Sequence, residues 1–246
     1  MPADNNSIVD QTHWDMGYEE LSLKTIPDHD LFKIFLKSII PQGNGSCIEI
    51  GAYPCRYLGI FVELGYKLSG IDTTPKIESA ELKMWFAENG WEYEILEKTN
   101  LFNFKPDKQF DVVCSLGFIE HFEDWEDIIL RHDALLKAGG YMVLQTPNFA
   151  GFVQRAIHVL TDKENYKRHI VRSMNPKKWA DVLRRDYEII YQGYWGGYSF
   201  WIENDKCNIF QKFLLKCFTV PVLLSRFLPN CRAYSPLCVL IARKNA

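Results

Sequence analysis

The chain has 246 residues, of which 47% are hydrophobic and 24% charged, with a formal net charge of −3. This length and composition fit one α/β domain with additions and an ordinary packed core. No stretch of about eighteen uninterrupted apolar residues occurs, which argues against a membrane span. The polar N-terminus argues against a secretory signal. Seven cysteines without a Cys-x-x-Cys pair argue against a zinc site, and we expect no metal and a reducing, cytoplasmic location.

Charge is distributed unevenly along the chain. No acid follows Asp205, whereas seven bases do, so residues 1–205 carry a net charge of −10 and the remainder carries +7. Such asymmetry is typical of a protein that meets an anionic surface or partner. A basic face on an otherwise acidic globule is the simpler alternative, and the sequence leaves both open.

In chain order, residues 1–45 are expected to form N-terminal cap helices. Apolar residues at Leu31, Ile34 and Phe35 have helical spacing over 28–40, with Asp28 or Asp30 available as the cap.

Strands and helices then alternate. Apolar runs predict strands near 46–51, 67–72, 91–96, 110–115 and 140–146, and the segments 55–66, 77–89 and 124–137 between them read as helices. This alternation predicts a parallel sheet with right-handed crossovers. Ligands of such sheets bind beyond the carboxyl ends of the strands, where Glu49, Asp72, Asn100 and Ser115 fall.

The last third of the chain is less regular. Residues 148–186 look mostly helical, and strands are expected at 187–194 and 235–243. Between these strands lies an insertion, 195–234, that is rich in aromatic residues. Its aromatic cluster, which begins in the preceding strand, is expected either to form a pocket wall or to pack under a loop. It comprises Tyr191, Tyr194, Trp195, Tyr198, Phe200 and Trp201.

The segment Cys47–Cys55 is the most informative motif. It reads as a buried strand that carries Glu49 and then turns tightly at Gly51, and a second strand ends in Asp72 about twenty residues later. An acid at the end of a second parallel strand commonly binds ribose hydroxyls. The G-x-G-x-x-G sequence of nicotinamide enzymes is absent, because the loop has only Gly51. A loop with one glycine can still pass beneath a nucleoside cofactor that has no phosphate.

This motif and three later ones resemble the class I S-adenosylmethionine-dependent methyltransferases. The later motifs are Asn100-Leu101-Phe102, the fourth-strand segment Phe110–Phe122, and the helix-to-strand segment Leu135–Asn148, whose Gly-Gly pair is expected to stop the helix. The resemblance is strongest to the broad group that includes quinone-biosynthesis enzymes. It implies a Rossmann-like seven-stranded sheet, mostly parallel with an antiparallel last strand, and helices on both faces.

The resemblance also implies the organisation of the chain. A single methyltransferase domain would span 1–246, with the cofactor-binding core at 46–148, a substrate-side helical and aromatic lid at 149–234, and the last strand at 235–246.

The resemblance further implies a set of S-adenosyl-L-methionine contacts. Asp72 would bind the ribose, Asn100 would accept from the adenine amino group, and Thr73 would hold the adenine edge. Tyr18 would close over the cofactor from the N-terminal segment. The remaining expected contacts are Glu49, Gly51, Ala52, Tyr53, Leu101, Ser115, Leu116 and Gly117.

His121 is the candidate catalytic residue, because a histidine near the transferred methyl group could accept a proton from the acceptor. The alternative is that the Glu-His pair only shapes the pocket. His158 and His169 lie in the helical cover and are expected to be packing or surface residues.

The expected function is therefore S-adenosylmethionine-dependent methyl transfer to a small-molecule acceptor, apolar or aromatic, by in-line displacement. The alternative is a catalytically inactive S-adenosylmethionine-binding scaffold or regulator. A nicotinamide oxidoreductase lacks its motifs, and no nucleic-acid partner is expected. Residues 206–228 are expected either to contact a membrane peripherally or to pack as a helix on the sheet edge. The sequence predicts neither the acceptor nor the oligomeric state.

Overall fold

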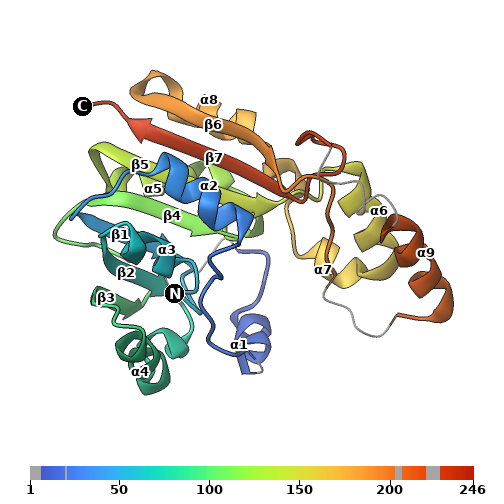
Figure 1. Ribbon diagram of the computed structural model, residues 1–246, viewed down its shortest axis with the longest axis horizontal. Helices are drawn as coiled ribbons and strands as arrows, with labels where there is room; N and C mark the ends of the chain where they lie inside the picture. Colours follow the sequence, from blue (N-terminus) through green and yellow to red (C-terminus); the bar gives the residue numbers. More distant parts are fainter. Residues whose placement is uncertain (1–6, 20, 203–206, 220–227) are drawn as a thin grey trace.

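The computed structural model describes residues 7–19, 21–202, 207–219 and 228–246. Within these ranges the chain forms a seven-stranded sheet of order β3-β2-β1-β4-β5-β7-β6 (Figure 1). Neighbouring strands from β1 to β5 are parallel, and β7 runs antiparallel to both β5 and β6. This arrangement confirms the predicted fold class. The strands are β1 (Ser46–Ile50), β2 (Lys67–Asp72), β3 (Tyr93–Lys98), β4 (Phe110–Leu116), β5 (Leu136–Pro147), β6 (Tyr187–Trp195) and β7 (Leu237–Lys244).

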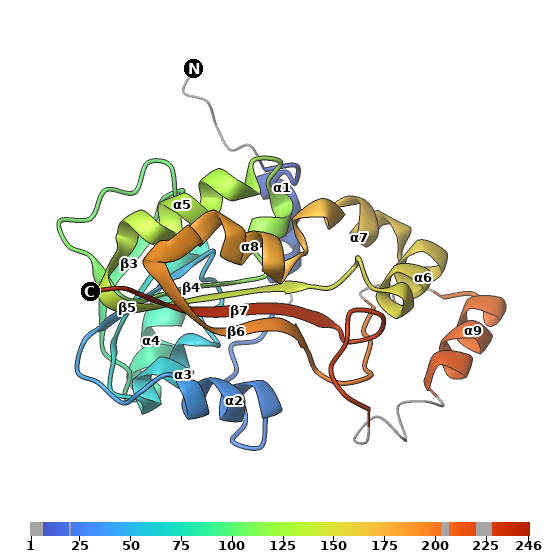
Figure 2. The ribbon, with the colours of Figure 1, turned by 90° about the horizontal axis from the view of Figure 1, so that it is seen from above.

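Helices cover both faces of this sheet. In Figure 2, α2, α3 and α4 lie on one face, and α5 and α8 lie on the other. The α-helices are α1 (Gln11–Glu19), α2 (Leu31–Ile39), α3 (Leu58–Glu63), α4 (Ala80–Glu88), α5 (Trp125–Leu135), α6 (Phe152–Thr161), α7 (Lys163–Lys167), α8 (Pro176–Leu183) and α9 (Ile209–Thr219). Short 3-10 helices are η1 (Pro75–Glu78), η2 (Ile119–His121), η3 (Val171–Ser173) and η4 (Arg184–Asp186).

The central strands supply two separate hydrophobic cores because successive side chains point to opposite faces. On β4, Val113 belongs to the core beneath α5 and α8, whereas Val112 and Cys114 belong to the core beneath α2, α3 and α4. Burial on both faces explains why these strands read as continuous apolar runs rather than as alternating ones.

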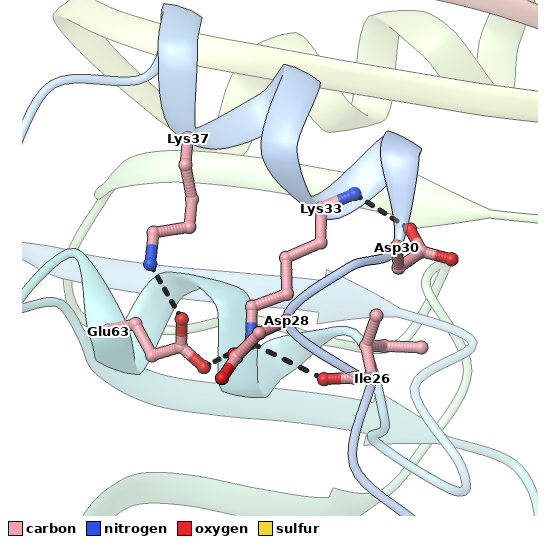
Figure 3. A network of polar contacts seen from close by, with 6 residues as sticks. All are labelled: Ile26, Asp28, Asp30, Lys33, Lys37 and Glu63. Carbon is pink, nitrogen blue, oxygen red and sulfur yellow. Dashed lines mark hydrogen bonds and ion pairs between the residues drawn. The ribbon is translucent and has the colours of Figure 1, made fainter.

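A buried lysine ties α2 to α3 (Figure 3). Lys33 is 4% exposed, and its ammonium donates to the carboxylates of Asp28 and Glu63 and to the carbonyl of Ile26. Glu63 also accepts from Lys37, at 2.7 Å. The Lys33 backbone N–H bonds the carboxylate of the predicted cap residue Asp30, at 2.8 Å.

The Gly139-Gly140 pair lies inside a strand, which corrects the expectation that it stops a helix. α5 already ends at Leu135, and β5 begins at the next residue. Gly139 has a φ of +76°, and the pairing of β5 with β4 shifts register here. Between the Phe110–Leu136 and Val112–Tyr141 pairs, β5 advances five residues while β4 advances two, which is more than the single extra residue of a simple β-bulge. The pair therefore realigns β5 against β4.

The helices α6, α7 and α9 stand beyond one end of the sheet (Figures 1 and 2). α9 contacts α6 through a hydrogen bond from Gln211 Nε2 to the carbonyl of Leu160, at 2.9 Å. On α9, Ile209, Phe210 and Phe213 are 89%, 66% and 61% exposed. In the described part of the chain, no helix is long and apolar enough to span a membrane.

Candidate functional site

A cavity of about 720 Å³, including its open mouth, lies at the carboxyl ends of β1, β2, β3 and β4. The predicted site residues that line it are Tyr18, Gly51, Asp72, Thr73, Asn100, Leu101, Gly117 and His121. The topology therefore brings together residues from four strand ends and from the N-terminal segment.

Asp72 is the fixed acid of this cavity. One carboxylate oxygen accepts from the backbone N–H of Tyr53 and the other from that of Thr74, each at 3.0 Å. Burial raises the pKa of Asp72 to about 6, and the backbone hydrogen bonds oppose that rise. Each oxygen keeps a lone pair. The carboxylate can thus accept further hydrogen bonds from ribose hydroxyls without leaving its position.

The loop after β1 keeps a tight course although it has a single glycine. Gly51 has a φ of +69°, and a Cβ at this position would lie 2.6 Å from a ring carbon of Phe118. Cys55, where the resembled family has another glycine, has a φ of +64°. Cys55 therefore has a left-handed backbone conformation, which glycine adopts more readily than other residues. Ala52 and Tyr53 do not line the cavity; they belong to the core beneath α2, α3 and α4.

Glu49, Ser115 and Leu116 lie close to the cavity but outside its lining. Glu49 is 3% exposed, and burial raises its pKa well above the ordinary value, with the nearby Asp72 charge adding to the rise. The Ser115 hydroxyl is buried and has no hydrogen-bond partner among the described residues. The side chains of Glu49 on β1 and Ser115 on β4 point into the layers that cover both faces of the sheet. The contacts expected of Ser115 and Leu116 are made through backbone groups, so they stay a prediction.

The helix α1 covers part of the cavity, because its Gln11, Trp14 and Tyr18 belong to the lining. Its Gln11 accepts a hydrogen bond from the Thr73 hydroxyl, and Lys76 Nζ donates to the carbonyl of Tyr18 at 2.8 Å. The ring of Trp14 meets His121 edge-on, with centroids 4.9 Å apart. Sequence reasoning found only Tyr18 on this helix. The spacing of Trp14 and Tyr18, four residues apart in a helix, was the available signal for the second aromatic residue.

Asn100 and Thr73 are already engaged in local hydrogen bonds. Asn100 Oδ1 accepts from the backbone N–H of Asn103 at 2.9 Å, which leaves one lone pair on that oxygen. The Thr73 hydroxyl donates to the side-chain oxygen of Gln11 on α1. An adenine contact of Asn100 would add to its bond with Asn103, because a lone pair is left on Oδ1. An adenine contact in which Thr73 donates would compete with its bond to Gln11.

His121 is held in one tautomer. Its Nδ1 lies 2.8 Å from the carbonyl of Arg168, and because a carbonyl only accepts, Nδ1 carries the proton and Nε2 the lone pair. Burial lowers the pKa of His121 to about 4. The imidazole is thus neutral at pH 7, and such a low pKa favours a positioning or binding role over that of a strong proton acceptor.

The six members of the aromatic cluster divide among three hydrophobic clusters of the described residues, and none of them lines the described cavity. Trp195 stacks on Phe35 of α2, with ring centroids 4.0 Å apart. Trp201 packs against Phe149 and His158 in the cover. Of the two expectations for this cluster, packing is the one that the contacts fit. The aromatic side chains that do line the cavity are Trp14, Tyr18, Phe102, Phe118 and Phe122.

The strand order, the antiparallel β7 and the cavity at the strand ends define an α/β protein of the methyltransferase type. A family model described as a methyltransferase domain matches residues 28–191, from just before α2 into β6. The chain therefore belongs to this methyltransferase domain family. Comparison of the sequence with curated proteins gives no significant match.

Solved structures similar to this chain share its fold at low sequence identity. An S-adenosylmethionine-dependent methyltransferase from Archaeoglobus fulgidus has 17% identity and a TM-score of 0.55, covering 96% of this chain and 100% of its own. A putative methyltransferase from Bacillus halodurans has 17% identity and a TM-score of 0.58, covering 87% and 99%. The N-methyltransferase NodS from Bradyrhizobium japonicum, in complex with S-adenosylhomocysteine, has 14% identity and a TM-score of 0.53, covering 88% and 84%.

Proposed function

We propose that this methyltransferase binds S-adenosyl-L-methionine in the cavity and transfers its methyl group to a small-molecule acceptor. The observation that carries the proposal is the Asp72 carboxylate, fixed by two backbone N–H groups beside the close-passing Gly51. Such a carboxylate suits a ribose, and a loop with one glycine suits a cofactor without phosphate. The structurally similar NodS was crystallised with S-adenosylhomocysteine, the demethylated form of this cofactor.

Methyl transfer from a sulfonium needs geometry more than acid-base chemistry. The acceptor lone pair, the methyl carbon and the sulfur must lie in line, and holding reactants in this way is worth about 7–11 kcal/mol of the barrier. An aromatic cavity partly covered by α1 can provide such positioning. The neutral His121 would orient the acceptor within this cavity.

The walls of the cavity suggest the chemistry of the acceptor. Phe102, Phe118 and Phe122 line one part of it together with Trp14. Aromatic rings of this kind stack on flat molecules and bury apolar ones. An apolar or aromatic acceptor fits this lining best.

The alternative function, a cofactor-binding scaffold without turnover, is motivated by Tyr53 and Cys55 in place of the usual glycines.

Calorimetric titration tests the cofactor. The wild-type protein should bind S-adenosylmethionine and S-adenosylhomocysteine at micromolar concentration and should not bind NADH. Asp72→Ala should lose this binding, whereas Asp107→Ala, at an exposed position, should keep it. Folded wild-type protein that binds neither adenosyl ligand would refute the proposal. Binding without turnover of any acceptor class would support the scaffold.

We also infer peripheral contact between α9 and an anionic membrane surface. Ile209, Phe210 and Phe213 expose large apolar side chains on a helix that also carries Lys212 and Lys216. Apolar side chains with basic neighbours are the combination that binds anionic lipid interfaces. Residues 206 and 220–227 of the predicted membrane-contact segment lie outside the described residues.

Vesicle co-sedimentation tests this contact. Phe213→Glu should abolish binding to vesicles containing anionic lipid, and Met84→Glu, which changes a 60% exposed apolar residue on α4, should not. Equal binding of both variants would refute the inferred surface.

A further inference from the structure

Three buried or half-buried side chains that the proposed methyl transfer leaves largely unexplained converge beside the cavity. Glu120 and His121 come from η2, and His169 comes from the segment after α7. One ligand atom from each, a carboxylate oxygen and two imidazole nitrogens, lie within 4.8 Å of one another. The two imidazole centroids are 4.7 Å apart.

Both imidazoles are oriented by backbone carbonyls. His121 Nδ1 donates to the carbonyl of Arg168 at 2.8 Å, and His169 Nδ1 donates to that of Asn165 at 2.7 Å. Each Nε2 therefore carries a lone pair. Metal-binding histidines in proteins are typically held in this way, because the bond to the far nitrogen fixes the tautomer and the direction of the ring.

The Glu120 carboxyl has no adequate partner for a negative charge among the described residues. Its side chain is 1% exposed, and its Oε2 has no hydrogen-bond partner there. Oε1 lies 3.8 Å from His121 Nε2, too far for a hydrogen bond. A buried carboxyl of this kind is stabilised when a cation is bound beside it.

We propose that Glu120, His121 and His169 bind one divalent transition-metal ion of the Zn²⁺ type. Two imidazoles and one carboxylate are a donor set that such ions prefer. Around tetrahedral Zn²⁺, ligand atoms lie about 3.4 Å apart, since metal–ligand distances are about 2.0–2.2 Å. The three ligand atoms, which lie within 4.8 Å of one another, would therefore approach by up to about 1.4 Å on binding the ion. Three protein ligands leave a coordination position open, as in catalytic rather than structural zinc sites.

The use of the ion rests on the proposed function. Because His121 lines the cavity, an ion bound by its imidazole would lie beside the cavity. A hydroxyl acceptor bound at the open position loses its proton to solvent more readily. Its oxygen then bonds to the methyl carbon as the carbon–sulfur bond breaks, and sulfur keeps the electron pair. The products are a methyl ether and S-adenosylhomocysteine, and the acceptor class is a hydroxyl compound.

The test is titration of the metal-stripped full-length protein with Co²⁺ and Zn²⁺. We expect one ion per chain, with the visible absorption of Co²⁺ bound to nitrogen and oxygen ligands. Glu120→Gln and His169→Ala should each weaken binding at least about tenfold, as even the loss of a supporting partner does. His169 is only half-buried, so its variant keeps the proposal testable if Glu120→Gln does not fold. His29→Ala, at an exposed position, should bind like the wild type.

Two outcomes would overturn the metal site. In the first, the folded wild type binds neither Co²⁺ nor Zn²⁺ stoichiometrically. In the second, both site variants bind the metal ion as tightly as the wild type does. Metal binding by a protein that does not bind S-adenosylmethionine would support the site and refute the proposed function. Binding of S-adenosylmethionine by a protein that binds no metal ion would support the proposed function and refute the metal site.

Discussion

Replacing Gly51 by alanine tests how tightly the loop beside the cavity is packed. The substitution is destabilising in two independent ways, through backbone strain and through a steric clash. Its φ of +69° lies in the left-handed region, and a Cβ would lie 2.6 Å from Phe118 Cδ2. Gly90 has almost the same φ, +67°, but nothing lies within 4 Å of its Cβ position. The two glycines therefore differ in packing and hardly at all in backbone conformation.

The expected magnitudes follow from this comparison. An alanine in the left-handed region costs about 1–2 kcal/mol, and the lower entropy of the unfolded chain offsets about 0.4–1 kcal/mol of that. Gly90→Ala should then lower the free energy of unfolding by about 1 kcal/mol. Gly51→Ala must also displace the Phe118 ring, and overpacking of this kind adds about 1–3 kcal/mol. Its total cost should be about 2–4 kcal/mol.

Urea denaturation of both variants measures the difference directly. Gly51→Ala should have the lower midpoint with an unchanged slope, and its affinity for S-adenosylmethionine should fall because Phe118 lines the cavity. Equal destabilisation by the two substitutions would show that Phe118 yields freely. The account of a tightly packed loop would then be wrong.

Three further predictions concern the acid, the lysine network and the cover. The pKa of Asp72 is raised to about 6, and a protonated carboxyl accepts fewer hydrogen bonds. The affinity for S-adenosylmethionine should therefore fall by up to about tenfold for each pH unit below 6. Calorimetry at pH 5 and pH 7.5 checks this. Above pH 6 the affinity should be flat. Glu63→Gln should destabilise the fold by about 1–3 kcal/mol, and more than Asp28→Asn, because the one carboxylate that it leaves beside the buried Lys33 is that of Asp28, which is 96% exposed. Thermal unfolding compares the two variants. Trp14→Phe should remove most of the fluorescence change on cofactor binding, because Trp14 lines the cavity; an undiminished signal would place the reporter elsewhere.

Much of the fold was predictable because its signals are local. Continuous apolar runs mark strands that are buried on both faces, and the alternation with helical segments implies a parallel sheet. The cap at Asp30 and the antiparallel last strand agree with the structure. The Gly139-Gly140 pair was misread because a helix stop and an irregular stretch of strand can both use a left-handed glycine, and only the pairing with β4 distinguishes them.

The candidate site was predictable only in part. Asp72 and Gly51 were found from the sequence because their positions follow from where strands end. Glu49 was placed at a strand end in the same way, yet its side chain lies outside the cavity lining. Side-chain direction at a strand end depends on which layer covers each face, and that is a property of the packed molecule.

By itself, the sequence determined the order of the strands along the chain, the acid at the end of the second one and the single-glycine loop, because each depends on a few neighbouring residues. Only the tertiary structure decided that α1 covers the cavity and that His169 meets Glu120 and His121. These contacts join segments far apart in the chain. Their proximity arises from the packing of the cover against the sheet, which no local pattern encodes.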